Sequence, residues 1–235
     1  MANHAILRHM RTQKAPPAPV LAMDVRQFRL DGPQLESCRV TSTWHVAHDV
    51  MATAHAVATD MGVTLNSFLL GTLAWVLHDV HEQRRFAISQ TYLGRTAEEL
   101  RAVGSYSVGV PMDFDFSEEP SLQAVCRYVQ RETPRIMALD VIVQSTQILT
   151  VAYELNDVRP IERPAEAKRR PSSIALMNLF FMVNQHSDGY AAMVLYDEGK
   201  CDAAWVDGQV ERWMGLWQGV REYTIDEHIV SGAQA

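Results

Sequence analysis

The sequence predicts an α/β protein in which helices pack against a mixed β-sheet. Apolar residues recur at helical spacing in several segments, and strand-like apolar or alternating runs stand between these segments. Two of those runs are joined by a short polar segment that ends in Asp188-Gly189, which is typical of a β-hairpin. We expect helices over 45–62, 65–80, 202–220 and from Pro120 onward, and strands over 23–30, 86–94, 106–116, 173–184 and 190–198.

The first helix is predicted from a single apolar stripe. Val46, Val50, Val57 and Met61 recur at helical spacing, and Gly62 stands where a helix ends.

Two later helices are predicted to be more deeply buried. Thr64 can cap the helix over 65–80, whose apolar face is broad. Pro120 can open a further helix, because its missing N–H is harmless in the first turn. The last helix carries an apolar stripe that we expect in the core: Trp205, Val210, Trp213, Trp217 and Val220.

The domain limits follow from composition. Residues 1–22 are rich in Pro and Ala and predict a flexible lead-in, residues 23–222 form one domain, and residues 223–235 form a polar tail. Residues 154–172 are polar, basic and interrupted by prolines, so we expect a long connection there.

Composition excludes several classes of protein. Hydrophobic residues make up 47% of the chain and charged residues 21%, which is typical of a globular domain. The net charge of −7 gives no indication of a surface for nucleic acid or an anionic membrane. No apolar run is long enough to span a bilayer and the start does not resemble a signal peptide, so we expect a cytoplasmic protein.

The sequence gives little indication of a metal site or of disulfide bonds. His45/His48 and His78/His81 have a spacing that could place two ligands on one helix face, but no third ligand is evident, so we expect no metal site. The three cysteines form no CxxC pair and are odd in number, which argues against a disulfide framework. They are Cys38, Cys126 and Cys201.

Several short motifs follow one another in an order typical of one family. They are Gly62-Val63-Thr64, Gly94-Arg95, Gly104-Ser105-Tyr106, Pro111, Ser117 to Leu122, and a final strand that ends in Tyr196-Asp197 before a Trp-rich helix. With this order, residues 23–222 resemble the C-terminal lobe of condensation domains from nonribosomal peptide synthetases, which belong to the chloramphenicol-acetyltransferase-like superfamily.

The resemblance implies a single lobe of a two-lobe fold, with a mixed sheet packed with helices. In that family, substrates tethered to the phosphopantetheine of a carrier protein meet in the cleft between the lobes, and no cofactor is bound. The implied partners are a complementary lobe or synthetase chain and a carrier protein. The other lobe carries a His-His-x-x-x-Asp-Gly motif, which this sequence lacks.

His186 is the candidate general base that the sequence offers. One residue separates His186 from Asp188, where the family motif has three, so this segment cannot reproduce the family's arrangement. We expect a hairpin turn here, with a functional histidine as the alternative.

The remaining site residues are implied by the resemblance. Gly94 and Arg95 would lie near the cleft, with Arg95 in a structural ion pair, and Gly104 and Tyr106 would line the cleft floor. Tyr196 and Asp197 would replace the two histidines of the other lobe's motif, which predicts a lobe without catalytic residues of its own.

These observations lead to one functional hypothesis and two alternatives. The chain would be half of a carrier-protein-dependent, amide-forming acyl or peptidyl transfer domain, and an enzyme only when paired with a histidine-bearing lobe. The alternatives are a non-catalytic module that docks carrier or tailoring proteins, and a homo-oligomeric acyltransferase that uses His186. The sequence also leaves open whether the chain is a natural split half or a piece of a longer gene.

Overall fold

The computed structural model describes residues 39–79, 84–93, 107–138, 151–161, 169–171, 179–198 and 201–219. Its centre is a sheet of seven strands in the order β3-β2-β4-β6-β7-β1-β5. The strands are β1 (Arg39–Val46), β2 (Arg85–Leu93), β3 (Ser107–Asp115), β4 (Val151–Ile161), β5 (Arg169–Pro171), β6 (Leu179–His186) and β7 (Gly189–Asp197). Strands β2, β4 and β6 run parallel, whereas the other neighbouring pairs are antiparallel, which confirms the predicted mixed sheet.

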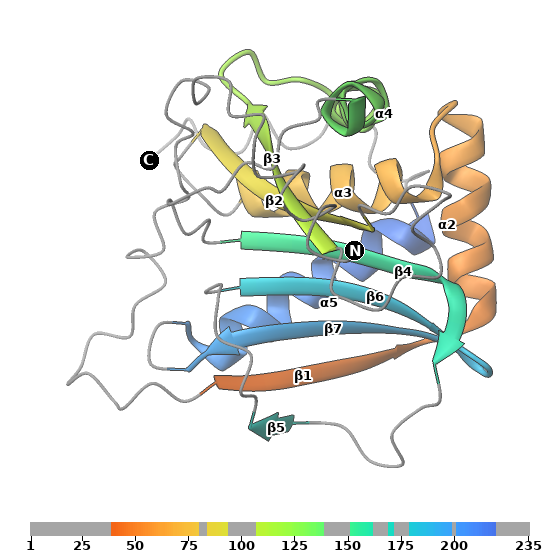
Figure 1. Ribbon diagram of the computed structural model, residues 1–235, viewed down its shortest axis with the longest axis vertical. Helices are drawn as coiled ribbons and strands as arrows, with labels where there is room; N and C mark the ends of the chain where they lie inside the picture. Colours follow the sequence, from red (N-terminus) through yellow and green to blue (C-terminus); the bar gives the residue numbers. More distant parts are fainter. Residues whose placement is uncertain are drawn as a thin grey trace, which may run out of the picture.

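Four helices accompany the sheet in the part of the chain that the structure describes. They are α2 (His48–Asp60), α3 (Leu65–Asp79), α4 (Leu122–Ala138) and α5 (Ala203–Gly219). In Figure 1 helices α3 and α5 lie behind the sheet, α2 stands at the right-hand end of the strands and packs on α3 and α5, and α4 packs on α3 near the β3 edge.

The core between sheet and helices is centred on Trp213 of α5. Its indole N–H donates to the carbonyl oxygen of Leu69 at 2.9 Å and to the hydroxyl of Thr72 at 3.1 Å. Its ring makes edge-on contacts with Phe181 of β6 and with Trp217, at centroid distances of 5.7 and 4.8 Å. The predicted stripe of the last helix is therefore core at Val210, Trp213 and Trp217, whereas Trp205 is only partly buried and packs against the core.

Helix α3 is buried on almost every side and begins where the sequence predicts. The Thr64 hydroxyl accepts a hydrogen bond from the backbone N–H of Ser67 at 3.2 Å, which is an N-cap. Gly71 allows α4 to approach closely, because a Cβ at this position would lie 2.7 Å from the Cys126 sulfur. Burial also raises the pKa of the Cys126 thiol to about 12, so the thiol stays protonated.

The first predicted helix is wrong at its start. His45 and Val46 belong to β1, and α2 begins at His48. The fully buried residues of α2 are Met51, Ala54 and Ala58, while Val50, Val57 and Met61 pack at the margin of the core. The sequence pattern identified the correct side of the helix but took the end of an unrecognised strand for its first turn.

The connection predicted over 154–172 is also wrong, because it contains most of β4 and all of β5. Pro160 is compatible with a central strand here because the pairing of β4 with β6 shifts between Asn156 and Ile161. Figure 1 shows β4 bending sharply at this end.

Several predictions fall outside the residues that the structure describes. These are the lead-in over 1–22, the strand over 23–30, the tail over 223–235, and the positions of Val80 and Val220. Among the described helices none is long and apolar enough by itself to cross a membrane; α2 and α3 reach that length only together, across a bend of 94°.

Candidate functional site

The candidate site is the face of the sheet that points away from α2, α3 and α5. We call it the open face because none of the described helices packs on it, although several of its residues, such as His186 and Leu195, are buried. Leu179, Phe181 and Val183 of β6 belong to the helix-side core. Successive residues of a strand point to opposite sides, so the residues between them belong to the open face. The open face of the central strands comprises Thr41, Thr43 and His45 of β1, Phe180, Met182, Asn184 and His186 of β6, and Ala191, Met193, Leu195 and Asp197 of β7. In Figure 1 none of the four labelled helices crosses this face.

The centre of the open face mixes apolar and polar side chains. Phe180 and Met182 on β6 are half-buried, and in register they stand opposite Leu195 and Met193 on β7. The Asn184 amide donates to the Met193 sulfur at 3.0 Å. Flexible thioethers beside an aromatic ring and an amide are typical of a surface that packs against other protein groups rather than of a solvated face.

One edge of the sheet gathers the carboxyl ends of the parallel strands. Strands β2, β4 and β6 end there at Leu93, Ile161 and His186. In sheets with parallel strands, ligands bind outside this edge more often than elsewhere. His186 therefore lies at the edge where a functional group is expected, and the residue is only 5% exposed.

The segment around His186 is a tight hairpin, as predicted. His186 pairs with Gly189 across the two-residue turn Ser187-Asp188. Gly189 has φ +149°, and a Cβ there would lie 2.7 Å from the carbonyl oxygen of Val46. Glycine is required at this position because the end of β1 approaches so closely.

The same close approach brings His45, His48 and His186 to one corner of the sheet. The His45 ring lies against Gly189, 3.0 Å from where its Cβ would be, and the His48 ring meets Tyr190 edge-on at 6.0 Å. His45 and His48 lie on different elements, which is why their i, i+3 spacing does not place them on one helix face as considered above. In the described parts of the chain, no three His, Cys, Asp or Glu side chains are arranged to hold a metal ion.

Tyr196 and Asp197 lie at the opposite edge of the sheet. Tyr196 pairs with Leu179 at the start of β6, seven residues along β7 from Gly189, a separation of about 23 Å. Both side chains are buried, and the Asp197 carbonyl accepts a hydrogen bond from the Cys201 N–H at 2.9 Å. The two candidate sites that the sequence places on this hairpin are therefore too far apart to act on one reacting atom.

The other predicted cleft residues, Gly94, Arg95, Gly104 and Tyr106, lie outside the described residues. Their nearest described neighbours, Leu93 and Ser107, pair with each other at the carboxyl edge that also holds His186. The roles of all these residues remain predictions.

Sequence reasoning missed the open-face residues Phe180, Met182 and Met193. The signal that could have found them is the uninterrupted apolar run over 179–183, because strands that are covered on both faces lack polar alternation. The hairpin motif beside this run indicated His186 as the candidate residue instead.

No protein-family model matches the sequence, and no curated protein matches it. Solved structures do match its fold. One comes from work on condensation domain-mediated chain release from the enacyloxin polyketide synthase; the identity is 12%, the TM-score is 0.64, and the match covers 78% of this chain and 41% of that one. The four-domain nonribosomal peptide synthetase holo-AB3403 matches at 14% identity and a TM-score of 0.66, over 90% of this chain and 18% of that one.

The acyl transferase PapA2 also matches, at 12% identity and a TM-score of 0.61, over 86% of this chain and 47% of that one. The chain therefore spans less than half the length of each of these three proteins. Such low identities establish the fold and nothing finer. This chain has the fold of one lobe of condensation domains and related acyltransferases, as the resemblance in its sequence predicts.

Proposed function

We propose that this chain is the C-terminal half of a carrier-protein-dependent acyl or peptidyl transfer domain of nonribosomal peptide or related natural-product biosynthesis. A partner lobe with the His-His-x-x-x-Asp-Gly motif would complete the cleft and supply the base for amide formation. The observation that carries the proposal is the open face, a mixed apolar and polar sheet surface in a chain that matches only one lobe of larger structures.

The division of labour follows from the residues that this chain has. Its sequence holds no His-His pair, so the proton transfer that amide formation needs would be carried out by the partner lobe. This chain would contribute one wall of the cleft through Phe180, Met182 and Met193. Substrates would arrive tethered to the phosphopantetheine of a carrier protein, with no cofactor bound by this chain.

One observation favours a second candidate, acyl transfer by a homo-oligomer that uses His186. His186 lies at the carboxyl edge of three parallel strands and on the open face, where a second copy of the chain would meet it. Its deep burial argues for a structural role in the hairpin, so we rank this candidate second. A non-catalytic docking module is the remaining alternative, and it predicts association with a partner lobe without amide formation.

The experiment is to mix the chain with a separately produced histidine-bearing lobe and with acyl-loaded and aminoacyl-loaded carrier proteins. We expect a complex on size-exclusion chromatography and amide product only in the complete mixture. Met193→Glu places a charge on the open face and should abolish both results, because a buried unpaired charge opposes association. Gln218→Glu, which adds the same charge at an exposed position of α5, is the matched control and should change neither.

The results separate the candidates. Association that survives Met193→Glu in a folded variant would contradict the role of the open face. His186→Ala should leave amide formation by the mixture unchanged. Loss of acyl transfer by the chain alone in a folded His186→Ala variant would favour the homo-oligomeric enzyme.

A further inference from the structure

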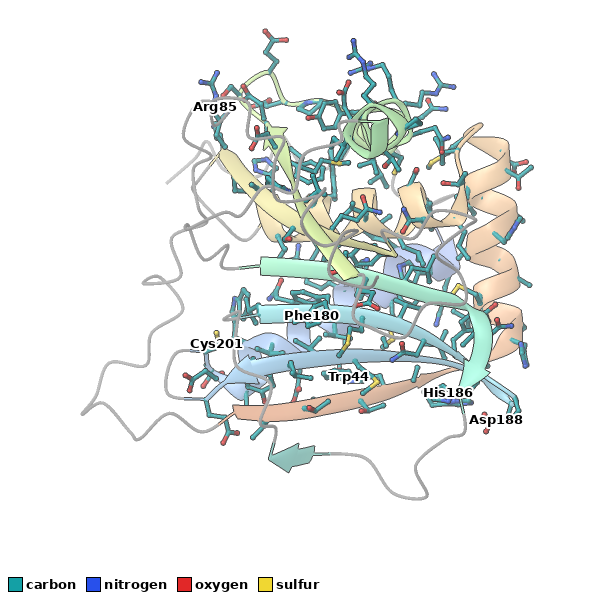
Figure 2. All side chains as sticks on the ribbon, in the orientation of Figure 1. Trp44, Arg85, Phe180, His186, Asp188 and Cys201 are labelled. Carbon is teal, nitrogen blue, oxygen red and sulfur yellow. The ribbon has the colours of Figure 1, made fainter. Side chains whose placement is uncertain are left out.

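Helix α4 carries a row of arginines on its solvent side. Arg127, Arg131 and Arg135 follow one another at intervals of four residues, and all three side chains are exposed. Figure 2 shows nitrogen-tipped side chains projecting outward around this helix. Such a row stands out in a chain whose net charge is −7.

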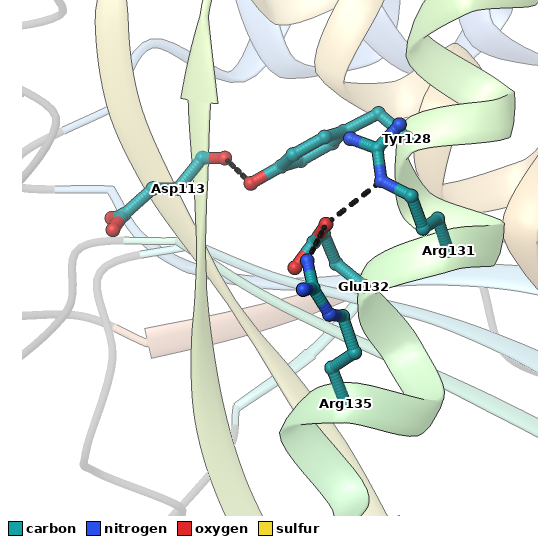
Figure 3. Close-up of polar contacts among 5 residues, drawn as sticks. All are labelled: Asp113, Tyr128, Arg131, Glu132 and Arg135. Carbon is teal, nitrogen blue, oxygen red and sulfur yellow. Dashed lines mark hydrogen bonds and ion pairs between the residues drawn. The ribbon is translucent and has the colours of Figure 1, made fainter.

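Two of these arginines are held in place by one carboxylate. The Glu132 Oε1 accepts hydrogen bonds from Arg131 Nε at 3.0 Å and from Arg135 Nη1 at 3.2 Å (Figure 3). Each guanidinium has five N–H groups, so most of its donors have no partner among the described residues. The hydrogen bond from Arg131 lowers the pKa of Glu132 below its usual 4.5, because it stabilises the charged form of the carboxylate.

Tyr128, the aromatic residue beside these arginines, is also held by a hydrogen bond. The Tyr128 hydroxyl donates to the Asp113 carbonyl oxygen at 2.6 Å, and the Arg131 guanidinium carbon lies 5.5 Å from the centre of the Tyr128 ring. Burial raises the pKa of Tyr128 to about 12, so the hydroxyl stays protonated even in moderately alkaline solution. The ring also meets Phe114 of β3 edge-on at 5.9 Å.

Arginine and tyrosine are the residues in which interface energy most often concentrates. Side chains that are already ordered lose less conformational freedom when a partner binds. The arginines of α4 stand about 6 Å apart along the helix axis, and carboxylates spaced four residues apart on a second helix have the same separation. Guanidinium groups bind carboxylates through two parallel hydrogen bonds, which adds geometric selectivity to the charge attraction.

We propose that this surface of α4, formed by Arg127, Tyr128, Arg131 and Arg135, docks an acidic helix of a partner protein. Glu132 lies within the surface and offsets part of its positive charge, which favours a helix with spaced carboxylates over a dense polyanion such as nucleic acid or an anionic membrane. The α4 surface lies at the β3 end of the molecule, apart from the open face of β6 and β7, so both surfaces can be occupied at once (Figure 1). This inference does not depend on the proposed function.

The test uses a fluorescent helical peptide of about 20 residues with glutamates spaced four residues apart along one face, and a second peptide with glutamine at those positions. Fluorescence anisotropy with the full chain should show binding of the glutamate peptide that weakens with salt, and no binding of the glutamine peptide. The double variant Arg131→Gln/Arg135→Gln should weaken binding by about tenfold or more, because it removes two charge-assisted contacts.

The control changes two other arginines of the same kind. Arg84 and Arg85 are also exposed and paired with carboxylates, Glu119 and Asp115, so Arg84→Gln/Arg85→Gln should leave the affinity within about twofold. Equal binding of both peptides, or undiminished binding by a folded Arg131→Gln/Arg135→Gln variant, would overturn the proposal. Tighter binding of duplex DNA or phosphatidylserine vesicles that displaces the glutamate peptide would overturn it as well.

Discussion

The two faces of the sheet are built from the same strands but have different chemistry. Phe180 and Phe181 are neighbours in the sequence, yet Phe181 is fully buried against Trp213 of α5 whereas Phe180 lies half-buried on the open face. On β7, Val194 belongs to the helix-side core and its neighbour Met193 contacts Asn184 on the open face.

This difference shows what each face contributes. The helix side is a continuous cluster of aromatic and aliphatic side chains, so it accounts for most of the apolar burial in the described parts of the chain. The open face keeps amide, thioether and histidine groups among its apolar residues. We therefore expect substitutions on the helix side to change stability, and substitutions on the open face to change association with a partner lobe.

The largest effect on stability is expected at Phe181, and its neighbour Phe180 provides the comparison. Phe181→Ala should lower the free energy of unfolding by about 4 kcal/mol, because it leaves a cavity beside Trp213. Phe180→Ala should cost only about 1 kcal/mol, since the side chain is already partly exposed. Urea denaturation followed by tryptophan fluorescence measures both values.

The same pair of variants separates stability from association. Phe180→Ala should weaken binding to the histidine-bearing lobe although the chain remains folded. Equal destabilisation by the two substitutions would show that the open face is as much a core as the helix side, and the comparison would fail.

A smaller effect is expected at the hairpin that closes the carboxyl edge. Gly189→Ala should lower the free energy of unfolding by about 2 kcal/mol, because the added Cβ meets the Val46 carbonyl oxygen and φ +149° is unfavourable for alanine. Gly208→Ala on α5 is the control: its Cβ meets nothing within 4 Å, so alanine should stabilise the helix by about 0.5–1 kcal/mol. Thermal unfolding of both variants checks the sign as well as the size, and a neutral Gly189→Ala would mean that β1 can move away from the hairpin.

The smallest effect should be a pH dependence of stability that is caused by His78 at the end of α3. The His78 ring stacks on Phe116 with their centroids 4.0 Å apart, and burial lowers the pKa of His78 below its usual 6.5. The nearby charges of Asp79 and Glu119 oppose this shift, and that of Arg84 adds to it. The unfolded chain then binds the proton more readily, so stability should be constant above pH 6.5 and fall as the pH drops from there through the lower folded pKa.

Nuclear magnetic resonance titration of the His78 ring measures the folded pKa directly. Substitution by phenylalanine, His78→Phe, preserves the ring stack and should remove this part of the pH dependence. A folded pKa at or above 6.5 would contradict the expectation.

Much of the fold could be predicted where local pattern and tertiary burial agree. The helix over 65–79 has an N-cap at Thr64 and an apolar surface that suits any buried position, so its neighbours did not need to be known. The hairpin could be predicted because Asp188-Gly189 between two apolar runs is a turn signal that is local to the sequence. Strands β1 and β4 could not: β1 merges into the apolar stripe of α2, and β4 carries Pro160 and a polar stretch that alone resemble a loop.

Local sequence patterns were sufficient to predict the α/β class, the buried helices and the hairpin, because each depends on the spacing of side chains along one segment. The sequence also shows that this chain lacks the His-His-x-x-x-Asp-Gly motif of the other lobe. The strand pairing in the folded chain was needed to show that His186 and Tyr196 stand at opposite edges of one sheet, and that Phe180 and Met193 share a face. The physical reason is that strand register and the choice of which face the helices cover are set by contacts between distant segments, and no local spacing records them.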